Sequence, residues 1–62
     1  MRYFMFSENQ YVQIMNHSEP SCNGEYGNIT EIVASNTSIF YTVQLEKDST
    51  LCMCTADELM EG

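Results

Sequence analysis

The fold of this chain is decided by one stretch, IFYTVQL at residues 39–45, in which aliphatic and aromatic side chains recur at every second position. A period of two places neighbouring residues on opposite faces of a β-strand. We therefore predict that Ile39, Tyr41, Val43 and Leu45 face a core, and that the residues between them face outward.

Turn-forming residues bound this strand on both sides. The sequences SNTS at residues 35–38 and EKDS at residues 46–49 are both typical of tight turns between strands. Beyond the second turn, TLCMC at residues 50–54 has the composition of a further strand. Successive turns of this kind predict antiparallel neighbours.

The strand that precedes residue 35 is predicted to be sharply curved. Ile29 and Val33 share one face of the segment 28–33, but Ile32 has the opposite parity. A β-bulge or a bend reconciles the mismatch, because one extra residue shifts the alternation by one position.

A fourth strand is predicted near the amino terminus, at residues 10–15. Val12 and Ile14 form its buried face. Residues 16–24 follow as a long polar loop, because they contain nearly every turn-forming residue type and include Pro20.

The carboxyl terminus carries a helical signal. Thr55 and Glu58 have the spacing of a capping box. In this motif the Thr55 side chain accepts a hydrogen bond from a backbone amide of the first turn, and the Glu58 side chain reaches back to the backbone amide of Thr55. Because so little chain follows, we predict a short helical or 3₁₀ turn with Leu59 pointing into the core.

These segments predict an all-β fold in a single domain spanning residues 1–62. A chain of this length buries only about 60% of its unfolded surface, so one thin core is expected. A strongly bent antiparallel barrel of about five strands would cover most strand edges. The apolar run YFMF at residues 3–6 would either add a strand or stay exposed as a partner or homodimer surface.

Four segments together resemble the small SH3-like barrels of the KOW type: YVQI at 11–14, GEYGNITEI at 24–32, YTVQL at 41–45 and ADEL at 56–59. The resemblance spans roughly residues 9–60 and implies the same five-stranded barrel. Nucleic-acid-binding members of that group have basic loops, whereas the loops here are acidic. Proline-peptide-binding SH3 domains use a groove with a tryptophan, and this chain has none.

The charge of the chain restricts the classes of molecule that it can bind. Nine acidic residues oppose two basic ones, which gives a net charge of −7. Such a surface repels phosphate backbones and anionic membranes, so we expect no direct nucleic-acid or membrane binding and a basic protein surface as partner. No apolar run has the length of a membrane span or a signal peptide, and we expect a cytoplasmic protein.

We therefore predict a non-enzymatic acidic binding module that docks on a basic surface, such as that of a nucleic-acid-binding protein. In size and charge alone the chain resembles phage-encoded nucleic-acid mimics such as anti-restriction and anti-CRISPR inhibitors. Acidic candidate contacts lie mostly in predicted loops and turns: Glu19, Glu25, Glu46, Asp48, Asp57, Glu58 and Glu61. Tyr11 and Tyr26 are candidate aromatic anchors.

Two alternatives stay open. The charge can serve solubility alone. The chain can also be a structural or zinc-stabilised module of a larger assembly, joined through apolar contacts of Phe4, Met5, Phe6 and Phe40.

No catalytic residues and no cofactor are predicted. His17 is the only histidine and lies in the polar loop, where we expect it to be exposed and without an orienting partner. No Ser/His/Asp arrangement or glycine-rich phosphate loop accompanies it.

Zinc ligands are the remaining chemical possibility. His17, Cys22, Cys52 and Cys54 are of the right types, and Cys52 and Cys54 project to the same side of a strand. Their C-x-C spacing departs from the usual C-x₂₋₄-C, so we favour Cys52 and Cys54 as small core residues and Cys22 as a loop thiol. A disulfide-stapled secreted domain is not expected, because the cysteines are odd in number and the last two are too close to pair comfortably.

Overall fold

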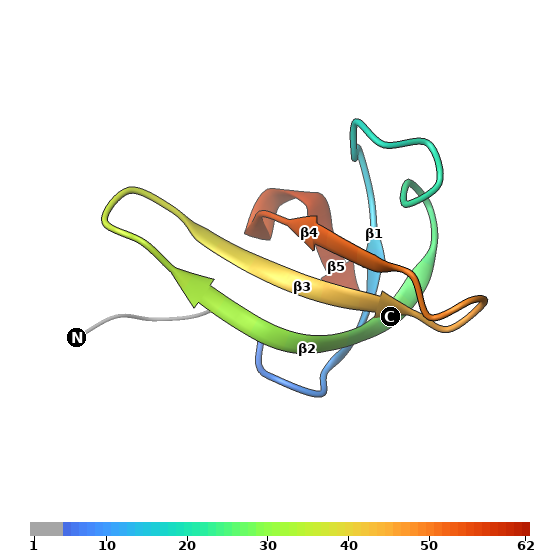
Figure 1. Cartoon of the computed structure of the whole chain (residues 1–62), viewed down its shortest axis with the longest axis horizontal. Coiled ribbons are helices and arrows are strands. Elements are labelled where there is room, and N and C mark those ends of the chain that lie inside the picture. The colour runs from blue at the N-terminus through green and yellow to red at the C-terminus, as the bar shows by residue number, and fades with distance from the viewer. Residues whose placement is uncertain (1–4) are drawn as a thin grey trace.

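Five β-strands form one antiparallel sheet in the computed structural model, which describes residues 5–62 (Figure 1). The elements in chain order are β1 (Tyr11–Ile14), β2 (Tyr26–Ala34), β3 (Ile39–Leu45), β4 (Leu51–Cys54), the 3₁₀ turn η1 (Ala56–Glu58) and β5 (Leu59–Glu61). The strand order across the sheet is β4-β3-β2-β1-β5. The all-β class, the five strands and the short 3₁₀ turn are thus confirmed.

The curvature predicted for β2 has the predicted cause. Its register against β3 shifts between Ile29 and Glu31, so a bulge separates Ile29 from Ile32, the residue of opposite parity. β2 and β3 form the long hairpin that curves across Figure 1. Gly27 permits their close approach, because a Cβ atom there would lie 2.2 Å from the carbonyl oxygen of Gln44.

The sheet is open at both ends. β4 and β5 are its two edges, and within residues 5–62 no ladder joins them, so closure into the predicted barrel is not confirmed. The physical reason is the short span between them. Only Thr55 and η1 separate β4 from β5, and these residues turn the chain over the end of the core instead of pairing it with β4.

The predicted inward faces are buried. The core contains the following side chains: Phe6, Val12, Ile14, Cys22, Ile29, Tyr41, Val43, Leu45, Cys52, Cys54 and Leu59. Every predicted inward residue of β1 belongs to it, as do three of the four predicted for β3. Ile39, the fourth, is partly buried and packs against the cluster.

Met5 and Phe6, the two described residues of the amino-terminal apolar run, lie in different surroundings. Phe6 is buried with its ring edge against Tyr41, at a centroid distance of 5.6 Å, and the Met5 amide donates to the Tyr41 hydroxyl at 3.1 Å. Met5 itself is 75% exposed. Phe6 is therefore part of the core and not a free partner contact, while Phe4 lies outside the described residues.

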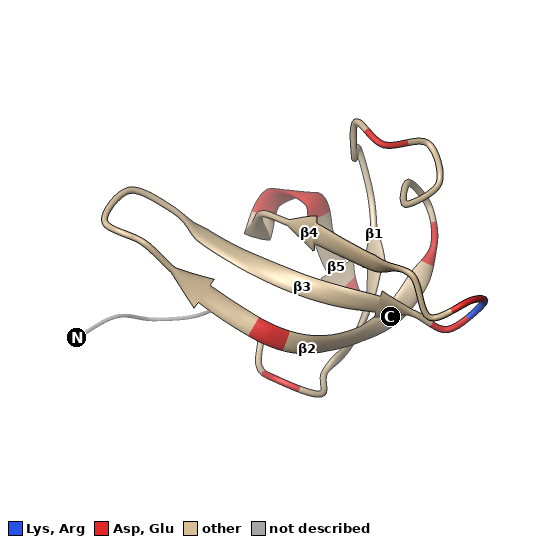
Figure 2. Ribbon diagram, in the orientation of Figure 1, with Lys and Arg blue, Asp and Glu red and all other residues tan. Residues whose placement is uncertain are grey.

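The acidic residues lie mainly outside the strands. Figure 2 shows them on the loops, on the β3–β4 hairpin and on η1, whereas the β2–β3 hairpin at residues 35–38 carries none. Glu31 lies on β2, and Glu61 ends β5. Among residues 5–62, no helix is long and apolar enough to cross a membrane.

Candidate functional site

The outer face of β1 collects exposed side chains from three strands. Because Val12 and Ile14 point into the core, Tyr11 and Gln13 point outward. Gln13 pairs with Tyr26 of β2 on one side and with Met60 of β5 on the other. Facing residues in adjacent strands project to the same side, so these outward side chains form one continuous surface.

Two tyrosines form the aromatic end of this surface. The Tyr11 and Tyr26 rings stack at a centroid distance of 5.7 Å and an interplanar angle of 16°. Each residue remains 39% exposed. The pair is thus held in place by a ring contact while one side stays open to a partner.

Carboxylates flank the tyrosine pair. The Tyr11 hydroxyl donates to Glu46 Oε1 at 2.9 Å, and the Glu46 amide donates to the Tyr26 carbonyl oxygen at 3.0 Å. The hydrogen bond to Glu46 raises the pKa of Tyr11 above its ordinary value, with desolvation and the negative charge of Glu46 acting in the same direction. Tyr11 therefore stays a neutral hydrogen-bond donor through the physiological pH range.

Three further charged residues lie at the same end. Lys47 Nζ lies 3.2 Å from Glu25 Oε2, which makes Glu25 a paired and not a free carboxylate. Asp48 Oδ1 accepts the Thr50 amide at 3.0 Å, and this backbone hydrogen bond is the main cause of its lowered pKa. Asp48 thus shapes the β3–β4 turn while remaining exposed.

Methionines form the other end of the surface. Met15 follows β1 with the outward parity of Tyr11 and Gln13, and its amide donates to the Glu58 carbonyl oxygen at 2.6 Å. Met15 and Met60 are 39% and 44% exposed. We call Tyr11, Tyr26, Met15 and Met60 the tyrosine–methionine face. The outward parity of Met15 is visible in the sequence, whereas the place of Met60 depends on the pairing of β5.

The carboxyl-terminal acids are not equivalent, because Glu58 lies next to Met15 whereas Glu61 pairs with Val12 and lies toward Tyr11. Glu58 Oε1 accepts the Thr55 amide at 2.9 Å, as the capping box predicted. Asp57 accepts a hydrogen bond from the Thr55 hydroxyl, and Asp57 and Glu61 are exposed. The predicted acids thus do not form one patch: Glu46 lies at the tyrosine pair, Glu58 lies next to Met15, and Glu19 lies apart on the 16–24 loop.

A second cluster contains sulfur. Cys22 and Cys52 form a disulfide with a Cα–Cα distance of 6.2 Å, so the prediction of a free loop thiol at Cys22 is wrong. Only pairing between neighbours was excluded by spacing, and the two partners are 30 residues apart in sequence. They meet because the polar loop folds back onto β4, which also buries Cys22.

His17 is held in this cluster, contrary to the prediction of an unoriented loop histidine. Its Nδ1 accepts the Glu19 amide at 3.0 Å, so Nε2 carries the proton and donates to the Met53 carbonyl oxygen at 2.8 Å. Met53 lies on the edge strand β4, so the imidazole ties the loop to a carbonyl group on that strand.

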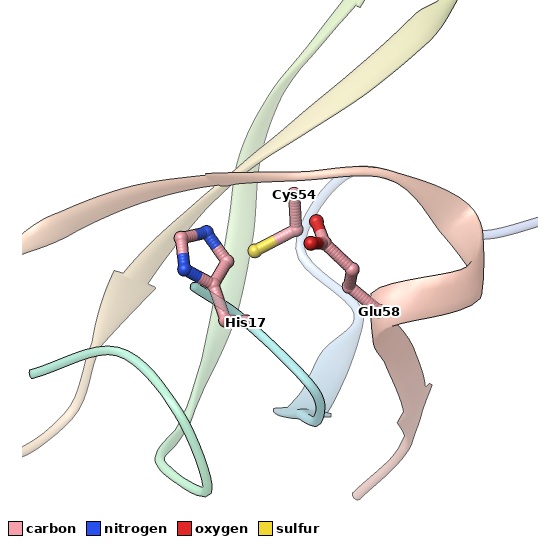
Figure 3. A group of neighbouring side chains, drawn as sticks. All are labelled: His17, Cys54 and Glu58. Atoms are coloured by element: carbon pink, nitrogen blue, oxygen red, sulfur yellow. The ribbon is translucent and has the colours of Figure 1, made fainter. Parts of the chain in front are cut away.

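Cys54 is the remaining cysteine and is fully buried. Its Sγ lies between His17 and Glu58, and the ligand atoms of the three residues all lie within 4.8 Å of one another (Figure 3). Burial, followed by the negative charge of Glu58, raises the pKa of Cys54 to about 12. Cys54 is therefore a neutral thiol near pH 7 and a poor nucleophile.

A hollow of about 530 Å³ lies beside the β2–β3 hairpin. Residues 35–39, Thr55 and Ala56 line it, and none of them is charged.

Comparisons of the chain with protein-family models, curated proteins and solved structures gave no match. The function is therefore inferred from the surfaces of the molecule itself.

Proposed function

We propose that the chain is a non-enzymatic acidic binding module that docks on a basic surface of a protein partner through the tyrosine–methionine face. The observation that carries this proposal is the exposed, stacked pair of Tyr11 and Tyr26 with the Glu46 carboxylate hydrogen-bonded at its edge. Aromatic and methionine side chains are enriched in the centres of protein interfaces, and charged groups at their rims.

The tyrosine pair suits arginine side chains in particular. A guanidinium group stacks on an aromatic ring and bonds a carboxylate with its fork of N–H donors. Tyr26 presents a ring, and Glu46 presents a carboxylate next to the same ring pair. Because both groups are already positioned by their mutual contacts, little side-chain entropy is lost on binding.

The remaining charge favours fast association. Nine acids are present, and the Lys47–Glu25 contact is the one ion pair found within residues 5–62. Uncompensated negative charge attracts a basic partner over a distance of about 10 Å, the Debye length at 0.1 M salt. A nucleic-acid-binding protein has a surface of this kind, and the chain would then act as a phage-type inhibitor or nucleic-acid mimic, similar in role to anti-CRISPR or anti-restriction proteins.

A cytoplasmic location remains part of this proposal. Disulfides persist mainly in oxidising compartments, so in the cytoplasm Cys22 and Cys52 would be kept as thiols. Trapping the thiols with an alkylating reagent in intact cells measures their state directly. Complete oxidation of this pair would contradict a cytoplasmic location.

The docking surface can be tested with a fluorescent arginine-rich peptide as probe. We expect fluorescence anisotropy to show binding that weakens steeply as salt rises, because counterions screen the attraction. Tyr26→Ala and Glu46→Gln should each weaken binding about fivefold or more, which is the typical effect of removing an interface anchor worth at least 1 kcal/mol.

Glu31→Gln is the matched control, because it removes the same charge from an exposed position elsewhere on β2. Its affinity should stay close to that of the wild type. An equal loss for Glu31→Gln and Glu46→Gln would show that net charge alone drives binding. Binding that does not depend on salt would refute electrostatic steering.

A second candidate function is a structural module that assembles through apolar contacts. Leu51 and Met53 on the edge strand β4 are 61% and 52% exposed, and Met5 is 75% exposed. Sedimentation at low and high salt distinguishes the two functions. A dimer or assembly that persists at high salt would favour the second candidate.

A further inference from the structure

All three cysteines and the only histidine of the chain meet at one corner of the molecule. The corner lies where the loop after β1 crosses β4. Two contacts hold the loop against β4: the Cys22–Cys52 disulfide and the bond from His17 Nε2 to the Met53 carbonyl oxygen at 2.8 Å. Within the loop, the His17 amide donates to Asn23 Oδ1 at 3.0 Å. Ligands from two distant parts of the sequence are thus brought together.

Alternation along β4 directs two sulfur atoms to the same side. Cys52 and Cys54 are 3% and 0% exposed, whereas Met53 between them is 52% exposed. Cys54 does not have the surroundings of a simple core residue. Figure 3 shows its Sγ pointing into the space between the His17 imidazole and the Glu58 carboxylate.

We propose that the reduced protein binds one Zn²⁺ ion at this corner through Cys22, Cys52, Cys54 and His17. Three cysteines and one histidine are an established ligand set of structural zinc sites. The two close cysteines of β4 supply one side of the site, and the loop supplies the other two ligands. Zinc would then join the same loop to the same strand that the disulfide joins in the oxidised protein.

The two forms are related by balanced chemistry. A dithiol reductant gives two electrons and two protons to the Cys22–Cys52 bond, the S–S bond breaks, two thiols form, and the reductant becomes a disulfide. Zn²⁺ then displaces one proton from each of three thiols. Three positive charges leave and two arrive, so the acidic character of the protein is retained.

His17 must change its partners to bind zinc through Nε2. The ring proton moves to Nδ1, and the hydrogen bonds to Met53 and Glu19 are given up. Both bonds are at the surface, where water replaces them. Reduction of the disulfide releases the loop at the same time, which allows the ring and Cys22 to move into tetrahedral positions. Glu58 keeps its capping bond to Thr55 and is not a ligand in this arrangement.

The test uses the full chain, reduced with a phosphine, which leaves as its oxide with oxygen from water. Co²⁺ is the spectroscopic probe, and Zn²⁺ is the competitor. We expect one Co²⁺ per chain with the intense absorption of a tetrahedral thiolate site, and complete displacement by Zn²⁺. The oxidised protein lacks two of the ligands and should not show this absorption.

Two substitutions separate the proposed ligands from their neighbour. Cys54→Ser should lower the affinity for Co²⁺ by at least about tenfold and weaken the thiolate absorption, because a first ligand is lost. Glu58→Gln, which removes the neighbouring carboxylate charge, should keep the stoichiometry and the spectrum. Wild-type affinity in Cys54→Ser, or loss of the spectrum in Glu58→Gln alone, would overturn the proposed ligand set.

Native mass spectrometry of the unsubstituted chain guards against a variant that fails to fold. Reduced protein incubated with Zn²⁺ should retain one zinc ion, and oxidised protein should retain none. Retention of no zinc by the reduced protein would overturn the site, and equal retention by both forms would place the metal on surface carboxylates. Peptide binding through the tyrosine–methionine face is measured separately, so failure of either proposal is recognisable.

Discussion

Replacement of Gly27 by alanine tests the close approach of β2 and β3. The new Cβ would lie 2.2 Å from the Gln44 carbonyl oxygen, 2.8 Å from its carbonyl carbon and 3.0 Å from the Leu45 Cα. All three atoms belong to the backbone, so no side-chain rotation relieves the clash. The β2–β3 ladder must therefore separate at this point, where Gly27 faces Leu45 in the register.

The size of the effect follows from this geometry. Inserting a methyl group into a tightly packed contact costs about 1–3 kcal/mol, and we expect the upper part of this range because only the backbone can move. A domain of this length has a free energy of unfolding of roughly 3–9 kcal/mol. A loss of about 2.5 kcal/mol would lower the melting temperature by roughly 10–20 °C.

Urea unfolding followed by circular dichroism measures this loss, with the disulfide intact in both proteins. Gly24→Ala is the control. Gly24 has a positive φ of 82° but nothing within 4 Å of a Cβ atom, so its substitution causes backbone strain of about 1 kcal/mol and no clash. A loss below about 0.5 kcal/mol for Gly27→Ala would refute the close strand contact, because that value is within the range of neutral surface substitutions.

Three further predictions concern the titratable and sulfur groups. Reduction without zinc should lower the free energy of unfolding by about 3.6 kcal/mol, because the disulfide closes a loop with a 30-residue sequence separation. Urea unfolding with and without phosphine measures this loss, and an unchanged urea midpoint would contradict the crosslink. Cys54, with its pKa raised to about 12, should react with iodoacetamide at pH 8 far more slowly in the native protein than in urea, and equal rates would show an accessible thiol. In an ultraviolet titration, Tyr11 should ionise above its ordinary pKa, so its hydrogen bond to Glu46 persists at neutral pH and is lost only as the pH rises through that raised value. Glu46→Gln should lower the pKa of Tyr11 again, and an unchanged titration would contradict the hydrogen bond.

Local patterns in the sequence predict most of this fold. The alternation in residues 39–45 identifies β3 and its buried face, and the parity conflict at Ile32 places the bulge of β2. The spacing of Thr55 and Glu58 predicts η1. These features are predictable because each depends on neighbours within a few residues.

Features that depend on tertiary pairing are not visible in the same way. β5 has only three residues, too few for a periodic signal, and it exists as a strand because it pairs with β1. The predicted anchors Tyr11 and Tyr26 stack because of the β1–β2 register. The disulfide depends on the path of the loop, which no local pattern describes. The tyrosines and acids were predicted as contacts from residue type, whereas the place of Met60 and the geometry of the face come from strand register.

The net charge and the sulfur cluster are connected through stability. A domain of 62 residues has a thin core, and repulsion among nine acids opposes its compact state. Small domains commonly compensate with a crosslink or a metal ion. Here the crosslink lies on the loop that carries Glu19 and leads to Glu25 and Tyr26, so it restrains the acidic segment beside the tyrosine–methionine face. A crosslink at this position stabilises the fold without removing any of the negative charge that the proposed partner would recognise.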